Sequence, residues 1–191
     1  MKKYLKSYLF YFAVAGVLIF LDQFTKNLVR SNILLGDGIC PIAGLCEQFR
    51  IVHWYNTGVA FGLFQGNSPL FAIIISLVIV AITVFYAQVP SNDWFLKLAL
   101  AFEMGGATGN LIDRISIGHV TDFVAIGNFP VFNVADACIN IGVAFMLISI
   151  LLEERKARQL AQESVPTEEA VLDEILDTEQ TPYEPTEKAA E

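Results

Sequence analysis

Four long apolar runs dominate the pattern of hydrophobic and polar positions along the chain. They cover residues 8–25, 69–88, 94–112 and 134–152. A helix needs ~20 predominantly apolar residues to cross a bilayer, and each run comes close to that length. The pattern predicts an all-α integral membrane protein with four transmembrane helices, formed by residues 1–158.

Two longer segments, residues 27–68 and 114–133, separate the first run from the second and the third from the fourth. Residues 47–55 (EQFRIVHWY) alternate polar with apolar, and GHVTDFVAI also has the character of an extended segment. Turn residues such as Gly36, Gly38 and Pro41 precede the first of these stretches, so we expect a few short strands. Residues 56–64 are expected to form a short surface helix. Together these segments predict a small β-rich cap on the helices.

Basic residues flank the outer ends of the first and last runs. They are Lys2, Lys3, Lys6, Arg155, Lys156 and Arg158. Lys and Arg concentrate on the cytoplasmic side of membrane proteins, so both termini are expected there and the two longer segments outside. No small-x-small cleavage site follows the first run, which is therefore expected to remain as an uncleaved helix.

The composition agrees with a membrane protein, since 54% of the residues are hydrophobic and only 17% are charged. The net charge of −8 arises in residues 159–191, which carry ten acidic residues and one lysine. We expect this segment to be a largely disordered cytoplasmic tail with a short amphipathic helix over residues 167–179. No basic patch is present, which argues against a nucleic-acid partner.

Polar residues recur near the outward ends of three of the four predicted helices. They are Asp22 and Lys26, then Asn110, Asp113 and Arg114, then Asn133, Asp136 and Asn140. A further aspartate, Asp122, lies in the second outward segment. A carboxylate at membrane depth costs ~2.5–3.5 kcal/mol, so a cluster at one level indicates a functional site at the outer membrane surface.

Several structural explanations compete with this interpretation. Asn and Asp side chains can join neighbouring helices, Asn133 could cap the fourth helix, and Asp113 could form an ion pair with Arg114. Asp22 and Lys26 are four residues apart and can pair on one helix face. A proton-coupled transporter using Asp22, Asp113 and Asp136 as a relay, or a membrane scaffold, are rival functions. Transporters usually place such charges near the midplane and contain repeats, whereas no repeat is visible here.

The sequence lacks the residue patterns that most other kinds of catalytic or binding site require. His53 and His119 have no ligand-like spacing with Cys or carboxylates, so a zinc site is not expected. No serine lies in a nucleophile elbow, and GGATGN lacks the lysine of a phosphate loop. What remains is the pair of Asp122 and Asp136. Two close aspartates do not ionise together easily, so one keeps a proton while the other can activate water.

Cysteine use leaves one question open. Cys40 and Cys46 lie in the first outward segment, and they could form a disulfide if that segment faces an oxidising compartment. The alternative is two free thiols.

Five sequence blocks resemble lipoprotein signal peptidase, the type II signal peptidase of bacteria. They are DQFTK at Asp22, NTGVAFG at Asn56, GGATGNLIDR at Gly105, GHVTDF at Gly118 and FNVADACI at Phe132. Any one of these blocks is weak alone, but five in the family's order are specific.

The resemblance implies an inner-membrane aspartic protease that acts on prolipoproteins, cutting just before a diacylglyceryl-modified cysteine. It implies that Asp122 and Asp136 are catalytic and that no cofactor is needed. The residues that it implies as supporting or substrate-binding are Asp22, Asn56, Asn110, Arg114 and Asn133. We further expect a monomer in contact with membrane lipid. We expect the small residues from Gly105 to Gly109 to leave room for the substrate helix, and Phe61, Phe64 and Phe132 to cover the lipid.

Overall fold

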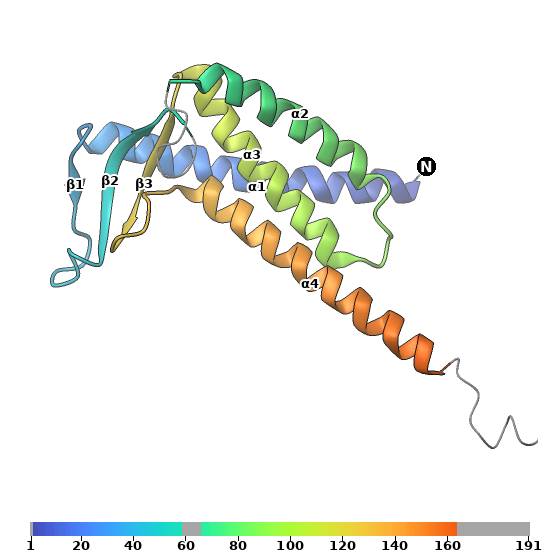
Figure 1. Ribbon diagram of the computed structural model, residues 1–191. Coiled ribbons are helices and arrows are strands. Elements are labelled where there is room, and N and C mark those ends of the chain that lie inside the picture. Colours follow the sequence, from blue (N-terminus) through green and yellow to red (C-terminus); the bar gives the residue numbers. More distant parts are fainter. Residues whose placement is uncertain (1, 59–65, 164–191) are drawn as a thin grey trace, which may run out of the picture. The chain divides into compact units, whose positions relative to one another are not determined.

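The computed structural model describes residues 2–58 and 66–163 (Figure 1). Its elements follow the order α1 (Lys2–Asn32), β1 (Gly38–Ile39), β2 (Phe49–Asn56), α2 (Ser68–Tyr86), α3 (Trp94–Ser116), β3 (Val120–Ile126) and α4 (Val134–Glu163). The chain divides into two compact units, Met1–Ser149 and Ile150–Glu191. The first unit contains every predicted site residue.

Three of the four helices are long and apolar enough to cross a membrane, namely α1, α2 and α4. The fourth, α3, has 23 residues but includes Lys97, Glu103, Asp113 and Arg114, which lower its hydropathy. The prediction of a mostly helical membrane fold with a small β-sheet is thereby confirmed. The count of four membrane spans stays a prediction.

Three helices extend beyond their predicted ends, and α3 does so by about one turn, to Ser116. α1 continues to Asn32 because Lys26 and Arg30 lie on the face that carries Asp22 and find acidic partners across the interface with α3. α4 continues to Glu163, past the expected start of the tail at residue 159. The helix expected over residues 167–179 lies outside the described residues.

The strands form one antiparallel sheet in the order β1–β2–β3. β2 and β3 coincide with the two segments expected to be extended, and their register places Trp54 opposite Asp122. The helix expected from residue 56 is wrong at its start, because Asn56 is the last residue of β2. The rest of that segment, including Phe61 and Phe64, is almost entirely outside the described residues. The sheet packs on the end of α1, where Val29 and Ile33 contact Phe123.

Close helix packing depends on glycines in α3. A Cβ atom at Gly105 would lie 2.8 Å from Leu18 of α1, and one at Gly106 would collide with the backbone oxygen of Ala135 in α4. Both glycines are buried. The expectation that this stretch leaves room for a substrate helix is therefore wrong, because the protein's own helices fill that space.

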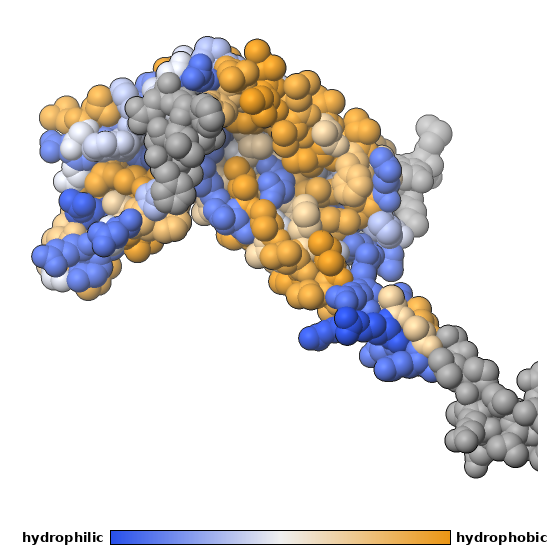
Figure 2. Space-filling model, in the orientation of Figure 1, coloured by the Kyte–Doolittle hydropathy of each residue, from blue (hydrophilic) through white to orange (hydrophobic). Residues whose placement is uncertain are grey.

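The loop between β1 and β2 contains a disulfide between Cys40 and Cys46, which answers the question left open by the sequence. On the face drawn in Figure 2, apolar side chains cover α2, whereas hydrophilic side chains are more frequent around the strands. This distribution fits a protein whose helices contact lipid and whose sheet contacts water.

Candidate active site

Asp122 lies in the middle of β3, and its carboxylate is almost fully buried, at 2% exposure. Each of its oxygens accepts one hydrogen bond from an amide side chain. Asn133 donates to Oδ1 over 2.7 Å, and Asn56 at the end of β2 donates to Oδ2 over 2.9 Å. The carboxylate is therefore fixed from two sides.

Asp136 lies in the first turn of α4, and both of its oxygens also accept hydrogen bonds. The side chain of Asn110 donates to Oδ1 over 2.8 Å, and the backbone N–H of Asn133 donates to Oδ2 over 3.2 Å. Asn133 returns the contact, since its Oδ1 accepts the N–H of Asp136 over 3.0 Å. This reciprocal pair is a capping box, so Asn133 does cap the fourth helix.

Asn133 joins the two carboxylates because its backbone binds Asp136 while its side chain binds Asp122. Asn133 is thus both the cap of α4 and a residue of the candidate site. Its amide also donates to Oδ1 of Asn110 over 3.2 Å, and Lys26 donates to that same oxygen over 2.9 Å. With Oδ1 of Asn110 taken by two donors, its amide nitrogen faces Asp136.

A buried ion network lies behind the two carboxylates. Lys26 has no exposed side-chain surface, and its ammonium lies 2.9 Å from Asp22 and 3.3 Å from Asp113. Arg30 pairs with Asp113 over 3.2 Å, and the backbone N–H of Thr121 donates to the same carboxylate over 3.0 Å. Asp113 therefore ties α3 to α1 and β3. The alternative that Asp113 pairs with Arg114 is wrong.

Asp22 connects this network to the start of α4. Its Oδ1 accepts the backbone N–H of Ala135 over 2.9 Å. The N-terminus of a helix carries partial positive charge, so a buried carboxylate is stabilised there. The contact requires Gly109 on α3, where a Cβ atom would lie 2.5 Å from the Asp22 carboxylate.

Arg114 extends from α3 to the end of β2. Its Nη2 donates to the backbone oxygen of Gly58 over 2.9 Å, and its guanidinium lies 5.8 Å from the ring centre of Phe71. Its buried Nε has no hydrogen-bond partner within residues 2–58 and 66–163. The Nε–H of Arg114 is thus an unused donor close to Asn110. The Nη1 of Arg114 also donates to the backbone oxygen of Asn110.

Burial is the main cause that raises the pKa of Asp122, from its ordinary 3.8 to about 6. The negative charge of Asp136 adds to this rise, which places the two carboxylates within electrostatic reach of each other. Hydrogen bonds from Asn56 and Asn133 favour the ionised form and limit the rise. Asp122 can therefore hold a proton at a pH where an exposed aspartate would have lost it.

All seven residues predicted for the site lie in this one network, but their roles stay untested predictions. The network also includes residues that were not predicted from the sequence, namely Gln23, Arg30, Thr121 and the carbonyl of Gly58. Gln23 bonds to both Asp22 and Asp113, and Arg30 could have been found from its four-residue spacing after Lys26. Asn140 contributes only a bond to the backbone oxygen of Asp136. Glu103 lies deeper, against Gly142.

No group of three or more His, Cys, Asp or Glu with the geometry to hold a metal occurs in the part of the chain that the structure describes. The arrangement is instead one of two carboxylates held by neutral amides, with a buried network of ion pairs behind them. Such a pair can take up and release a proton without a change of fold.

Comparison with known proteins gives the family. A family model described as signal peptidase (SPase) II matches residues 14–152, a range that includes all seven predicted site residues. The lipoprotein signal peptidase of Brevibacillus brevis is 38% identical over 152 residues, covering 78% of this chain and 100% of that protein. That of Halalkalibacterium halodurans is 40% identical over 153 residues, covering 78% and 96%.

Solved structures agree with these relatives. A bacterial membrane enzyme solved by the in meso method at 2.3 Å resolution superimposes with a TM-score of 0.70 and 29% identity, covering 75% of this chain and 88% of that one. A second, at 1.9 Å resolution, gives a TM-score of 0.67 and 30% identity, covering 74% and 92%. The match of the family model and the extent of these similarities lead to one conclusion: the chain belongs to the signal peptidase II family, whose members are aspartic-type proteases.

Proposed function

We propose that this protein removes the signal peptide from prolipoproteins, with Asp122 and Asp136 as its catalytic pair. The observation that carries the proposal is the bridge through Asn133, which holds both carboxylates at once. The cut falls just before a cysteine that carries diacylglycerol. Membership of the family supports the substrate class, and the amide-held carboxylates support the mechanism.

The reaction needs one proton on the pair. Asp122, whose pKa is raised to about 6 by burial and by Asp136, carries that proton more readily than an isolated aspartate. The ionised partner takes a proton from a water molecule, which attacks the scissile carbonyl carbon, while the protonated partner donates to the carbonyl oxygen. Collapse of the tetrahedral intermediate then returns a proton to the leaving amine.

The supporting residues have separate tasks. Asn56, Asn110 and Asn133 hold the carboxylate oxygens in place, and Asp22 positions the start of α4. The Nε–H of Arg114 has no hydrogen-bond partner within the described residues. It is suited to donate to a backbone carbonyl of the substrate beside the cut. Preorganised groups of this kind reduce the entropy lost on reaching the transition state.

The protein acts in the bacterial cytoplasmic membrane as a monomer with four spans. Both termini are cytoplasmic, and the carboxylates lie at the outer surface, where the signal helix and lipid of a substrate meet. The apolar surfaces of α1, α2 and α4 support this placement. No metal or organic cofactor takes part.

The decisive experiment compares a lipidated with an unlipidated prolipoprotein as substrate. Purified protein should release the signal peptide from the lipidated form only. Asp122→Asn and Asp136→Asn should each lower the rate by at least ~10²-fold while preserving the fold, because an amide cannot exchange a proton at neutral pH. The double variant should be little worse than either single one.

Asp37→Asn is the matched control, since Asp37 is an exposed aspartate directly before β1. It should cleave at the unmodified rate. A near-normal rate in either site variant would overturn the aspartic mechanism and favour the transporter interpretation.

A further inference from the structure

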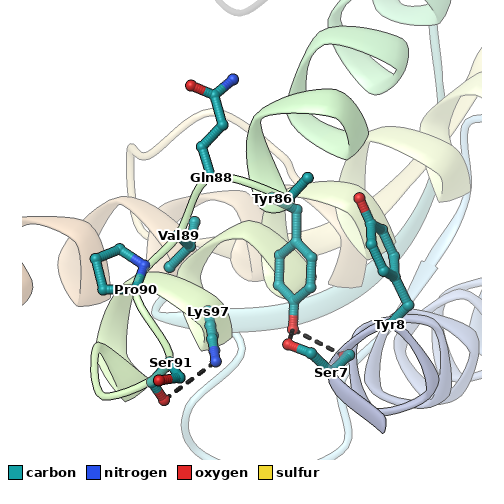
Figure 3. Close-up of a pocket in the computed structure, with 9 residues that line it drawn as sticks. Ser7, Tyr8, Tyr86, Gln88, Val89, Pro90, Ser91 and Lys97 are labelled. Carbon is teal, nitrogen blue, oxygen red and sulfur yellow. Dashed lines mark hydrogen bonds between the residues drawn. The ribbon is translucent and has the colours of Figure 1, made fainter. Parts of the chain in front are cut away.

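A second polar site lies at the other end of α1 from the carboxylates. It is a cavity of about 300 Å³ between the start of α1, the end of α2 and the start of α3 (Figure 3). Its polar lining comprises Ser7, Tyr8, Tyr86, Gln88, Ser91 and Lys97, and we call it the Lys97 pocket. Ser7 precedes Asp22 by 15 residues of helix, a distance of roughly 22 Å, so the pocket is separate from the candidate active site.

Lys97 is the charged residue of this lining, and it is half-buried. Its ammonium donates to the backbone oxygen of Ser91 over 3.1 Å. Within the described ranges it has no carboxylate at ion-pair distance. A lysine offers three donors and no acceptor, so the ammonium has capacity left for an anion.

The nearest candidate counter-ion is engaged elsewhere. Asp93 precedes Lys97 by one helical turn, the spacing at which an ion pair would form. Its carboxylate instead caps α3 through the N–H of Leu96 over 2.9 Å and accepts the hydroxyl of Ser149 over 2.7 Å. The positive charge therefore faces the pocket without a neutralising partner.

Hydrogen bonds between α1 and α2 hold the wall opposite Lys97 in place without a ligand. The hydroxyl of Tyr86 donates to the backbone oxygen of Ser7 over 2.9 Å and lies 3.0 Å from its hydroxyl. Tyr8 donates to the backbone oxygen of Thr83 over 3.1 Å. These contacts join α1 to α2, as Figure 3 shows for Ser7 and Tyr86. A ligand would find the pocket already formed, as is usual for binding sites.

The pocket lies at the end of an apolar helix that is long enough to cross a membrane. The apolar span of α2 ends at Tyr86, which is a lining residue. Trp94 is 55% exposed and packs against Phe10 with ring centres 4.8 Å apart. Tyr and Trp are enriched where lipid headgroups begin. Leu5 and Leu9, on the same turns of α1 as Ser7, are about 70% exposed and offer apolar surface beside the pocket.

We propose that the Lys97 pocket binds a phosphate group, that of an anionic glycerophospholipid. Lys97 is its counter-ion, and the acyl chains lie along the exposed apolar side chains of α1. The pocket recognises a phosphate whose headgroup carries a net negative charge. Phosphatidylcholine, whose headgroup is zwitterionic, therefore binds less well. This site adds a lipid ligand on the side of the membrane opposite to the proposed chemistry.

The test is native mass spectrometry of the purified full chain in detergent, titrated with phosphatidylglycerol or phosphatidylcholine. The unmodified protein should bind phosphatidylglycerol about fivefold more tightly, the effect of one lysine at a lipid surface. Lys97→Gln should remove most of this preference, and Lys97→Arg should keep it. Lys6→Gln, which removes an exposed lysine outside the lining, should leave the preference for phosphatidylglycerol largely intact.

Each alternative result has a definite meaning. An unchanged preference in Lys97→Gln, or an equal loss in Lys6→Gln, would overturn the proposal, because general surface charge would then explain binding. Inorganic phosphate is titrated in parallel and followed by ³¹P line width. If it alone binds in a Lys97-dependent way, the lipid is wrong and the ligand is a soluble phosphate. Signal-peptide release should be unchanged in Lys97→Gln, which reports that the variant is folded.

Discussion

Asn133 donates a 2.7 Å hydrogen bond from its side chain to Oδ1 of Asp122. The same residue caps α4 and holds Asp136 through its backbone N–H. A helix cap usually contacts only its own helix, but the side chain of Asn133 also binds a residue of β3. The geometry of the two carboxylates therefore depends on one asparagine.

Asn133→Ala should lower the specificity constant kcat/KM by ~10²-fold, because the Asp122 carboxylate loses the amide that fixes it. It should also cost ~1 kcal/mol of stability through the lost cap. Asn140→Ala is the control, since Asn140 lies on the same helix and bonds only to a backbone oxygen. The measurement is the cleavage rate of a lipidated substrate, normalised to folded protein. Equal rates in the two variants would contradict the proposed role.

The pKa of Asp122 should respond to its two neighbours in opposite directions. Asp136→Asn removes a negative charge and should lower the pKa from about 6, whereas Asn56→Ala removes a hydrogen bond to the ionised form and should raise it. Infrared spectroscopy of the carboxyl stretch against pH measures both shifts. An unchanged pKa in both variants would show that burial alone sets the value.

The same pKa predicts the pH dependence of stability. The folded value lies above the ordinary 3.8, so the folded protein binds this proton more tightly than the unfolded chain does. The contribution of Asp122 to the free energy of unfolding is therefore greatest below pH 3.8 and falls as the pH rises to about 6. Asp122→Asn should remove this component of the profile. Thermal unfolding in detergent at a series of pH values tests it.

Gly109→Ala should destabilise the protein by ~1–3 kcal/mol and lower activity, because the added methyl group would lie 2.5 Å from the Asp22 carboxylate. Asp22 would then be displaced from the start of α4. Gly16→Ala is the control, since nothing lies within 4 Å of a Cβ atom at that position in α1. It should be neutral or slightly stabilising. Chemical unfolding of both variants distinguishes crowding at the site from a general effect of helix glycines.

Lys26→Met should cost ~3–5 kcal/mol, because it leaves Asp22 and Asp113 buried without the ammonium that they share. Arg158→Met breaks the exposed pair with Glu154 and should cost less than ~1 kcal/mol. Unfolding of the two variants in the same detergent gives the comparison. A small effect in Lys26→Met would mean that other donors replace the lysine.

Reporter fusions test the proposed topology. Fusions after Ser91 and Arg158 should report the cytoplasm, and fusions near Gly44 and Gly127 the outside. A cytoplasmic signal at Gly127 would place Asp122 on the wrong side and overturn the proposed location of the site.

Local patterns predicted much of this architecture. Period-two alternation predicted β2, the extended character of GHVTDFVAI predicted β3, and the four-residue spacing of Asp22 and Lys26 predicted their ion pair. The capping role of Asn133 was also foreseen, as one alternative to a functional role. These features depend on neighbours in sequence, which is why the sequence displays them.

The contacts between elements were not predictable in the same way. Whether Asn110 presents its nitrogen or its oxygen to Asp136 depends on Lys26, which lies 84 residues away in the chain. The glycines of α3 were recognised as sites of close approach, but the sequence did not show that α1 and α4 make the approach. The end of α1 was misjudged because its extra turns are stabilised by partners on α3.

The bond between Asp22 and Ala135 has a consequence for biosynthesis, since it joins positions 113 residues apart. A ribosome delivers the first helix long before the last, so a nascent chain carries Asp22 without its partner on α4 for much of translation. Under the proposed mechanism, the catalytic pair is complete only when the final helix, which carries Asp136, has been inserted and has docked. We therefore expect the incomplete protease to be inactive while it is being made.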